Sequence, residues 1–62
     1  MKINPANITT NIWFNDRMGQ WNWVLIVEDI ETKETQMHSG NALDKRQARH
    51  DIMATISWLN SH

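Results

Sequence analysis

The side chains that could do acid–base or metal chemistry in this 62-residue chain are three histidines and seven carboxylates. His50 and Asp51 are adjacent, but neighbouring positions on a helix point about 100° apart, so these two residues do not form an acid–base pair. Metal binding requires ligands one helical turn apart or clustered in a loop, and His38, His50 and His62 have neither spacing. The sequence therefore indicates no metal site.

Signatures of nucleophilic catalysis and of phosphate binding are also missing. The chain has no cysteine, and no serine stands in a nucleophile-elbow pattern. Its two glycines, Gly19 and Gly40, stand far apart, whereas a phosphate-binding loop needs several glycines close together. We therefore expect a protein that is not an enzyme and that uses no cofactor.

The basic side chains are the next candidates, because they could contact phosphate groups. Arg17 lies in a polar segment, and Lys45, Arg46 and Arg49 lie in the first turns of a predicted helix. These four residues either form a patch that contacts phosphate groups, or they are simply solvent-exposed charges on a loop and on the outward face of the helix. The net charge is −1, so no overall field attracts nucleic acid or an anionic membrane, and any electropositive surface is local.

Aromatic residues dominate the rest of the composition. Trp13, Phe14, Trp21 and Trp23 lie close together, and Trp58 lies near the end of the predicted helix. Each tryptophan brings a large apolar area and one indole N–H. A chain of this size builds only one thin core, and without cysteine it has no disulfide to support that core. The cluster is therefore either a compact aromatic core or an exposed aromatic face.

Three predicted strands and one helix must position these residues. β-Branched and aromatic residues predict the first strand, and strict alternation with apolar residues on both faces predicts that the second strand is central. The predicted segments are, in order, a lead-in arm (1–7), a strand (8–15), a turn (15–20), a strand (21–29), a tight connection (31–33), a polar edge strand (34–39, ending at Gly40) and a helix (44–60).

The start of the helix carries the clearest boundary signal. Asp44 is the expected N-cap, and Gln47 completes a capping-box pattern. Leu43 is expected to pack on Ala48 as a hydrophobic staple. Trp58 flanks the apolar stripe and is expected to close the edge of the core. The apolar stripe at helical spacing consists of Ala48, Ile52, Thr55, Ile56 and Leu59, with Met53 on its other flank.

These elements predict one α+β domain, residues 1–62, in which a three-stranded antiparallel β-meander packs on one C-terminal α-helix. The inner face of the central strand should carry Trp21 and Trp23, which are expected to be largely core residues. Val24 and Ile26 should lie on the opposite face. Because Trp13 and Phe14 are consecutive in a strand, they point to opposite faces, and one of them lies outside the core that the helix covers.

The pattern Gly19-Gln20-Trp21, followed by a strand closing at Gly40 and a helix capped at Asp44, resembles the AP2-type DNA-binding domain and the arm-binding domains of phage integrases. This resemblance spans residues 12–59. It implies a three-stranded sheet that enters the major groove and presents Arg and Trp side chains, with the helix behind it. The family's sheet arginines are absent from this chain, which has asparagines in this region instead.

The chain is short, forms one predicted domain and has neither cysteine nor catalytic groups. In these respects it is similar to small accessory proteins of bacteriophages and mobile elements. We therefore expect a non-enzymatic interaction module, or inhibitor, that binds a host protein or a second copy of itself. The absence of cysteine fits a cytoplasmic location, which we also expect. The expected partner-binding residues are Trp13, Phe14, Arg17, Val24 and Ile26. The alternative is DNA binding through the sheet, with phosphate contacts from Arg17, Lys45, Arg46 and Arg49.

Overall fold

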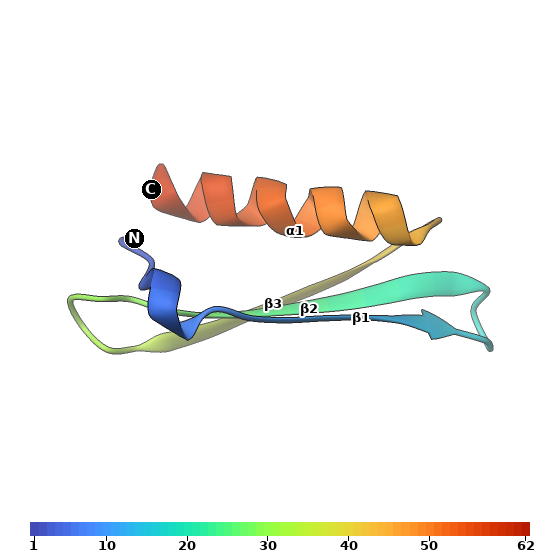
Figure 1. The fold of residues 1–62 in the computed structure, drawn as a ribbon, viewed down its shortest axis with the longest axis horizontal. Helices are drawn as coiled ribbons and strands as arrows, with labels where there is room; N and C mark the ends of the chain where they lie inside the picture. Colours follow the sequence, from blue (N-terminus) through green and yellow to red (C-terminus); the bar gives the residue numbers. More distant parts are fainter.

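The computed structural model describes residues 1–62 and consists of one three-stranded sheet with one long helix across it (Figure 1). The strands are antiparallel in the order β1-β2-β3, so β2 is central. The expected α+β meander with a C-terminal helix is confirmed. In chain order, the elements are the 3₁₀ helix η1 (Pro5–Asn7), β1 (Thr9–Asn15), β2 (Gln20–Glu28), β3 (Thr35–Ala42) and α1 (Lys45–Asn60).

Two tight turns connect the strands, and each is organised by a side chain at its start. The Oδ1 atom of Asn15 accepts hydrogen bonds from two N–H groups of the β1–β2 turn, and Gly19 adopts a φ of 62° there. The Oδ1 atom of Asp29 does the same in the β2–β3 turn, where Lys33 has a φ of 66°. Asn, Asp and Gly favour such geometry, so local chemistry explains the starts of both turns and the conformation of Gly19. It does not explain the positive φ of Lys33, which is the only non-glycine residue with this conformation.

Strand β3 runs two residues beyond the predicted end at Gly40. Gly40 lies inside the strand, opposite Trp23 of β2. A Cβ atom added at Gly40 would lie only 2.7 Å from Cζ2 of the Trp23 indole. The glycine therefore does not end the strand. It leaves the space that the indole occupies on the helix side of the sheet.

The helix begins where the sequence predicts, but its capping is simpler than expected. The Asp44 carboxylate accepts a hydrogen bond from the N–H of Gln47 at 2.7 Å, which confirms the N-cap. The side chain of Gln47 donates to Asp51 instead of returning to the cap. The predicted staple is wrong, because Leu43 is 85% exposed. Ala42 points inward, so its neighbour along the extended chain points away from Ala48.

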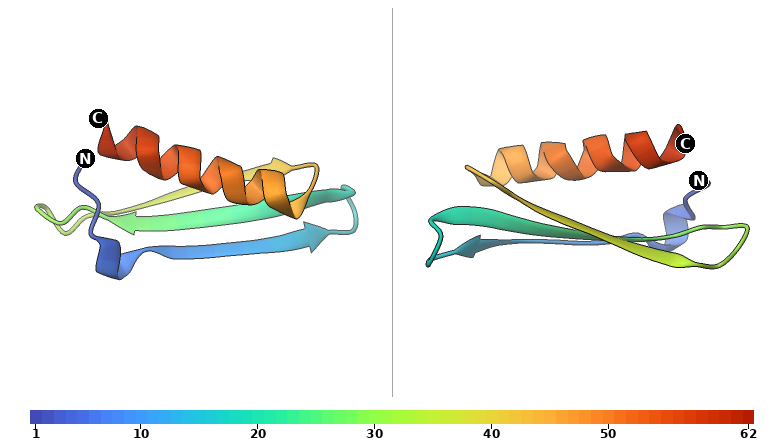
Figure 2. Two further views of the ribbon diagram at one scale, coloured as in Figure 1. Left: turned by 45° about the horizontal axis from the view of Figure 1, so that its top comes forward. Right: turned by 180° about the vertical axis from the view of Figure 1, so that it is seen from behind.

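Helix α1 covers one face of the sheet and buries a thin core between the two layers (Figure 2). The predicted helical stripe faces this core, with Thr55 and Ile56 half-buried at its margins. Trp21 is half-buried and packs against the core, whereas Met53 is exposed. The buried residues are Ile3, Trp23, Leu25, Val27, Ala42, Ala48, Ile52 and Leu59.

The N-terminal segment, expected as a lead-in arm, is fastened to the end of the sheet. Ile3 forms an isolated antiparallel bridge with Asp29, and its side chain is part of the core. The N–H of Asn4 donates to the carbonyl of Glu28 at 2.9 Å. The N–H of Ile3 also lies 3.4 Å from Oδ1 of Asn60, so both chain termini lie at the same end of the molecule (Figure 1).

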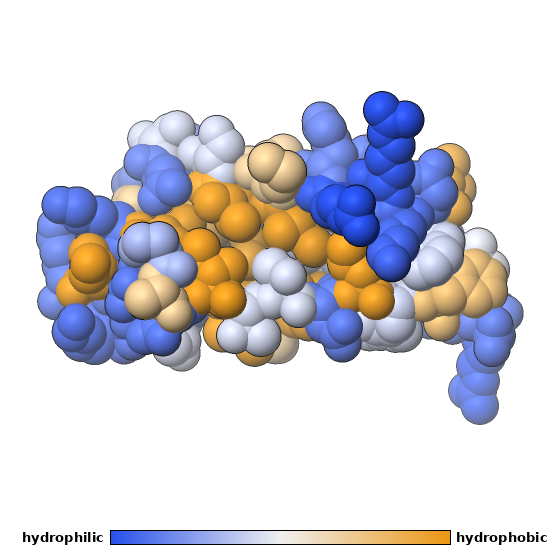
Figure 3. Space-filling view, viewed as in Figure 1, coloured by the Kyte–Doolittle hydropathy of each residue, from blue (hydrophilic) through white to orange (hydrophobic).

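The molecule is elongated for its size. Its Cα atoms extend over 39 × 17 × 15 Å, and the radius of gyration is 12.4 Å, against roughly 10.5 Å for a compact domain of this length. On the β1 side, hydrophobic side chains form a band between the helix and the sheet (Figure 3). Ile8, Ile12 and Ile56 are half-buried and pack against the core. One helix therefore covers only part of the apolar surface of the sheet.

Candidate interaction surface

The face of the sheet opposite α1, which we call the open face, has no covering layer. Strand register arranges its side chains in three rows that run from β1 through β2 to β3. Trp13 begins the row nearest the β1–β2 turn, and Met37 ends the third row. The rows are Trp13, Asn22 and Asn41, then Asn11, Val24 and Ser39, then Thr9, Ile26 and Met37.

All three strands contribute apolar side chains to the open face. Trp13 is 43% exposed, Ile26 is 36% exposed and Met37 is 69% exposed. Val24 is half-buried at the centre. The register makes Ile26 and Met37 direct cross-strand neighbours. The open face therefore combines an exposed tryptophan with an aliphatic centre, a combination typical of binding surfaces.

The polar groups of the three rows are uncharged. The three rows contain no Lys, Arg, Asp or Glu, and the first carboxylate on this face is Glu28, at the end of β2. Asparagine, serine and threonine side chains surround the apolar centre. Each of these side chains can both donate and accept hydrogen bonds. The open face therefore presents neutral hydrogen-bonding groups around an apolar centre.

A shallow hollow of about 360 Å³ lies on this face. Its walls are side chains of Trp13, Asn22, Val24 and the β3 residues Ser39 and Asn41. The two other lining residues are the cross-strand pair Trp23 and Gly40, whose positions alternate to the helix face, so they contribute backbone to the floor. The hollow is thus open sheet backbone flanked by an exposed indole.

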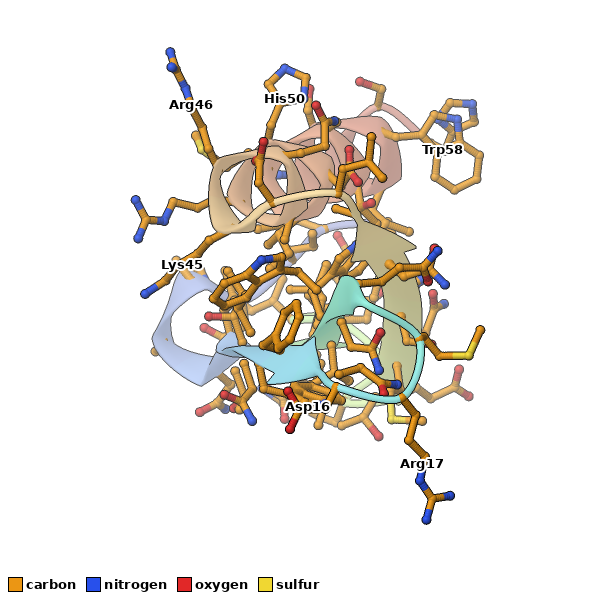
Figure 4. The ribbon with its side chains drawn as sticks, turned by 90° about the vertical axis from the view of Figure 1, so that its right-hand side faces the viewer. Asp16, Arg17, Lys45, Arg46, His50 and Trp58 are labelled. Carbon is orange, nitrogen blue, oxygen red and sulfur yellow. The ribbon has the colours of Figure 1, made fainter.

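The structure separates the expected partner-binding residues. It places Trp13, Val24 and Ile26 together on the open face. Phe14 lies on the helix face, where its ring contacts that of Trp21 edge-on at a centroid distance of 5.4 Å. Arg17 lies in the β1–β2 turn and points away from the body of the molecule (Figure 4). Trp13 is therefore the aromatic residue that the open face presents.

The four candidate phosphate-binding residues do not share one surface. Lys45 and Arg46 project from the start of α1, in the layer above the sheet, while Arg17 projects from the opposite corner (Figure 4). Arg49 is exposed on the same helix. A duplex lying on the open face would therefore be separated from the basic residues of α1 by the sheet itself.

Sequence reasoning missed the contribution of β3 to this face. Alternation along β3 groups Met37 with Ser39 and Asn41, but alternation alone does not assign the group to either face. The pairing of Ile26 with Met37 makes that assignment. The sequence did contain one indication of this contribution: the polar segment between the two turn signals carries one large apolar residue, Met37.

Trp58 does not close the edge of the core, contrary to the expectation. It is 57% exposed and stacks on the ring of His62 with centroids 4.3 Å apart. It projects from the helix on the β3 side of the molecule (Figure 4). The sheet has three strands, and β3 is its edge, so no further strand lies beneath this indole. Trp58 is therefore a second exposed tryptophan, on a different surface from Trp13.

Glu28, at the end of the open face, holds the N-terminal segment. Its Oε1 atom accepts hydrogen bonds from Nδ2 of Asn4 at 2.9 Å and from Nδ2 of Asn7 at 3.0 Å. These hydrogen bonds favour the ionised form and lower the pKa of Glu28, with a smaller contribution from Lys33 and a small opposing effect of desolvation. The carboxylate thus links the segment containing η1 to the central strand.

Acidification is expected to release this segment. Because the pKa of Glu28 is lower in the folded chain than in the unfolded chain, the carboxylate stabilises the fold above its unfolded pKa. This contribution is lost as the pH falls through the folded pKa. In an NMR titration, the side-chain amide signals of Asn4 and Asn7 should shift together at a pH below the normal glutamate range. Glu28→Gln should abolish the shift, and a transition at the usual glutamate pKa would contradict this account.

The structure contains no group of three or more His, Cys, Asp or Glu side chains that could hold a metal ion. No helix in it combines the length and the apolar character needed to cross a membrane. The observed fold belongs to the class of small two-layer α+β domains, with a helix on one face of the sheet and a neutral, uncovered surface on the other. Comparisons with protein-family models, curated proteins and solved structures give no significant match.

Proposed function

We propose that this protein is a non-catalytic interaction module that binds a protein partner through the open face. One observation carries the proposal: strand register brings Trp13, Val24, Ile26 and Met37 together on a sheet face that the helix leaves uncovered. Contiguous apolar groups with a polar surround are characteristic of surfaces that another macromolecule covers. The rest of the proposal follows from the chemistry of this face.

The composition of the open face favours a protein over nucleic acid. Cores of protein interfaces are depleted in charge and enriched in aromatic residues and methionine, as this face is. Nucleic-acid binding depends on cations that neutralise phosphates, and the three rows contain none. The basic side chains of α1 lie in the other layer. Electrostatics therefore supports a partner without a dense negative charge.

Trp13 is the expected hot spot of the interface. It is the largest side chain on the open face, and the hollow beside it gives a partner side chain a place to enter. Truncating such an anchor weakens binding by about 2 kcal/mol or more, which corresponds to a loss of about 30-fold in affinity.

The test uses the two exposed tryptophans as a matched pair. Tagged wild-type protein, Trp13→Ala and Trp58→Ala would be used for affinity capture, and captured proteins would then be titrated by calorimetry. We expect Trp13→Ala to weaken binding about 30-fold and Trp58→Ala to leave it unchanged. Met37→Lys, which places a charge on an exposed edge position, should weaken binding as well. Circular dichroism would verify that all variants are folded.

Three results would overturn the proposal. The first is a partner that both open-face variants bind with wild-type affinity. The second is a partner that only Trp58→Ala loses, which would place the interface on the helix. The third is duplex DNA that the wild-type protein binds at low salt and that substitution of Arg17, Lys45, Arg46 and Arg49 abolishes, since this would support nucleic-acid binding instead.

A further inference from the structure

The open face carries a projection on one side and a hollow on the other. The projection is the Trp13 indole, on edge strand β1. The hollow extends toward the opposite edge strand, β3, where Ser39 and Asn41 form its far wall. Trp13 and Asn41 belong to the same cross-strand row, so both features lie at the same level along the strands.

We propose that a second copy of this chain covers the open face, with each Trp13 seated in the hollow of the other copy. This inference rests on the proposed function and specifies its partner. A two-fold axis that lies between the two sheets and runs along β2 places β1 of one copy over β3 of the other. It keeps each residue at its own level along the strands, so each Trp13 faces the wall formed by Ser39 and Asn41. A two-fold axis across the strands would instead place β1 over β1, away from the hollow.

The polar chemistry of the face is self-complementary, as a two-fold interface requires. Asn22, on the central strand, lies near the axis and can pair with its own copy, because its amide carries a donor and an acceptor. Asn11 and Asn41, on the edge strands, instead face Ser39 and Trp13 of the other copy.

A charged residue would meet its own like charge near the axis. The three rows contain no charged side chain, so the pairing brings no like charges together within them. The carboxylate nearest the axis is Glu28, at the end of β2, where hydrogen bonds from Asn4 and Asn7 hold it.

The size of the face also suits a dimer. The Cα atoms extend over 39 Å along the strands and 15 Å across the sheet, turns included, which sets a footprint of at most about 600 Å² for each copy and about 1,200 Å² for the pair. Contact along the whole length of the sheet would reach the lower limit of stable, specific protein interfaces, so the expected dimer is a weak one. A chain of 62 residues without cysteine is also the kind of scaffold that gains stability by association.

Sedimentation equilibrium from about 1 μM to 1 mM tests the inference directly. We expect the wild-type protein and Trp58→Ala to reach a dimer in this range. Trp13→Ala and Met37→Lys should raise the dissociation constant by about 30-fold or more. A wild-type protein that is monomeric throughout the range would overturn the inference, as would a dimer that both open-face variants leave intact.

A third substitution separates insertion into the hollow from general hydrophobic adhesion. Ser39→Leu makes the open face more apolar, but it fills the hollow that Trp13 of the other copy would enter. We expect this substitution to weaken the dimer, while Ser57→Leu, the same change at an exposed position on α1, leaves it close to wild type. A stronger dimer with Ser39→Leu would overturn the proposed docking geometry.

NMR spectra of ¹⁵N-labelled protein at increasing concentration locate the interface. The amides of Asn11, Trp13, Val24 and Ser39 should shift, and those of α1 should not. Shifts confined to the outer amides of β1 or β3, with new protection from hydrogen exchange, would show edge-to-edge pairing and overturn the inference. A monomeric protein whose binding to another protein still depends on Trp13 would overturn only this inference. If the dimer has the expected geometry but other proteins bind outside the open face, this inference stands. Only the proposal that the open face also binds other proteins is then overturned.

Discussion

Trp23→Ala is expected to remove a large part of the stability of the fold, about 3–5 kcal/mol. Trp23 is the largest buried side chain of the protein, at the centre of β2 and facing the helix. Removing a buried tryptophan side chain costs about 3–5 kcal/mol, and a domain of this length has a total stability of roughly 3–9 kcal/mol. The expected loss is therefore comparable to the whole free energy of unfolding.

Urea denaturation at one fixed protein concentration measures this loss. Trp58→Ala is the control, because it removes the same side chain from an exposed position and should change the stability by less than about 0.5 kcal/mol. Trp23→Phe should be milder than Trp23→Ala. It keeps one buried ring and removes Nε1, a buried donor without a hydrogen-bond partner. An unfolding free energy of Trp23→Ala within about 1 kcal/mol of wild type would contradict this assignment of the core.

Gly40→Ala is the second substitution with a large expected effect, although it adds only one methyl group. The added Cβ would lie 2.7 Å from Cζ2, 2.8 Å from Cε2 and 2.9 Å from Nε1 of Trp23. All three atoms belong to a buried ring system, so the ring or the strand must shift. Such overpacking costs about 1–3 kcal/mol. In a strand without this contact, alanine would instead be favoured over glycine.

A double-mutant cycle isolates the cause of this effect. Trp23→Phe removes the indole atoms that the new methyl group would approach, so Gly40→Ala should cost less in that background than in the wild type. The expected coupling exceeds about 0.5 kcal/mol. Gln36→Ala, at an exposed position on the same strand, is the control and should be nearly neutral. Additive effects of Gly40→Ala and Trp23→Phe would show that the indole is not the obstacle.

The same residue pair connects the core to the open face. On the helix side, the missing side chain of Gly40 leaves room for the Trp23 indole. On the open side, the backbone of both residues forms the floor of the hollow. A shift of β3 caused by Gly40→Ala would therefore alter the hollow as well as the stability. Loss of stability and loss of self-association are expected together for this variant, whereas Trp13→Ala should affect association chiefly.

Features set by short-range interactions were predictable from the sequence. The Asp44 cap depends on a hydrogen bond to a residue three positions away, and the Asn15 turn depends on neighbouring N–H groups. The alternation from Trp21 to Val27 also predicted which side of the central strand faces the helix. Each of these depends on the geometry of a few consecutive residues, which the residue types alone constrain.

Features set by distant neighbours were not predictable in the same way. Gly40 was interpreted as a strand end because its partner, the Trp23 indole, lies on another strand. Trp58 was assigned to the core because helical periodicity does not reveal how wide the sheet beneath it is. The expectations of a non-enzymatic role, a protein partner and a cytoplasmic location stay predictions.

The sequence by itself determined the order of the elements, the capped start of the helix and the inward direction of Trp23, because these follow from local hydrogen bonding and from side-chain periodicity. Only the tertiary structure decided that Trp13, Val24, Ile26 and Met37 share one neutral face beside a hollow. The physical reason is register: a shift of one residue between strands would move every side chain of a strand to the other face. Residues from three strands become neighbours only when that register is set by the turns and by packing against the helix.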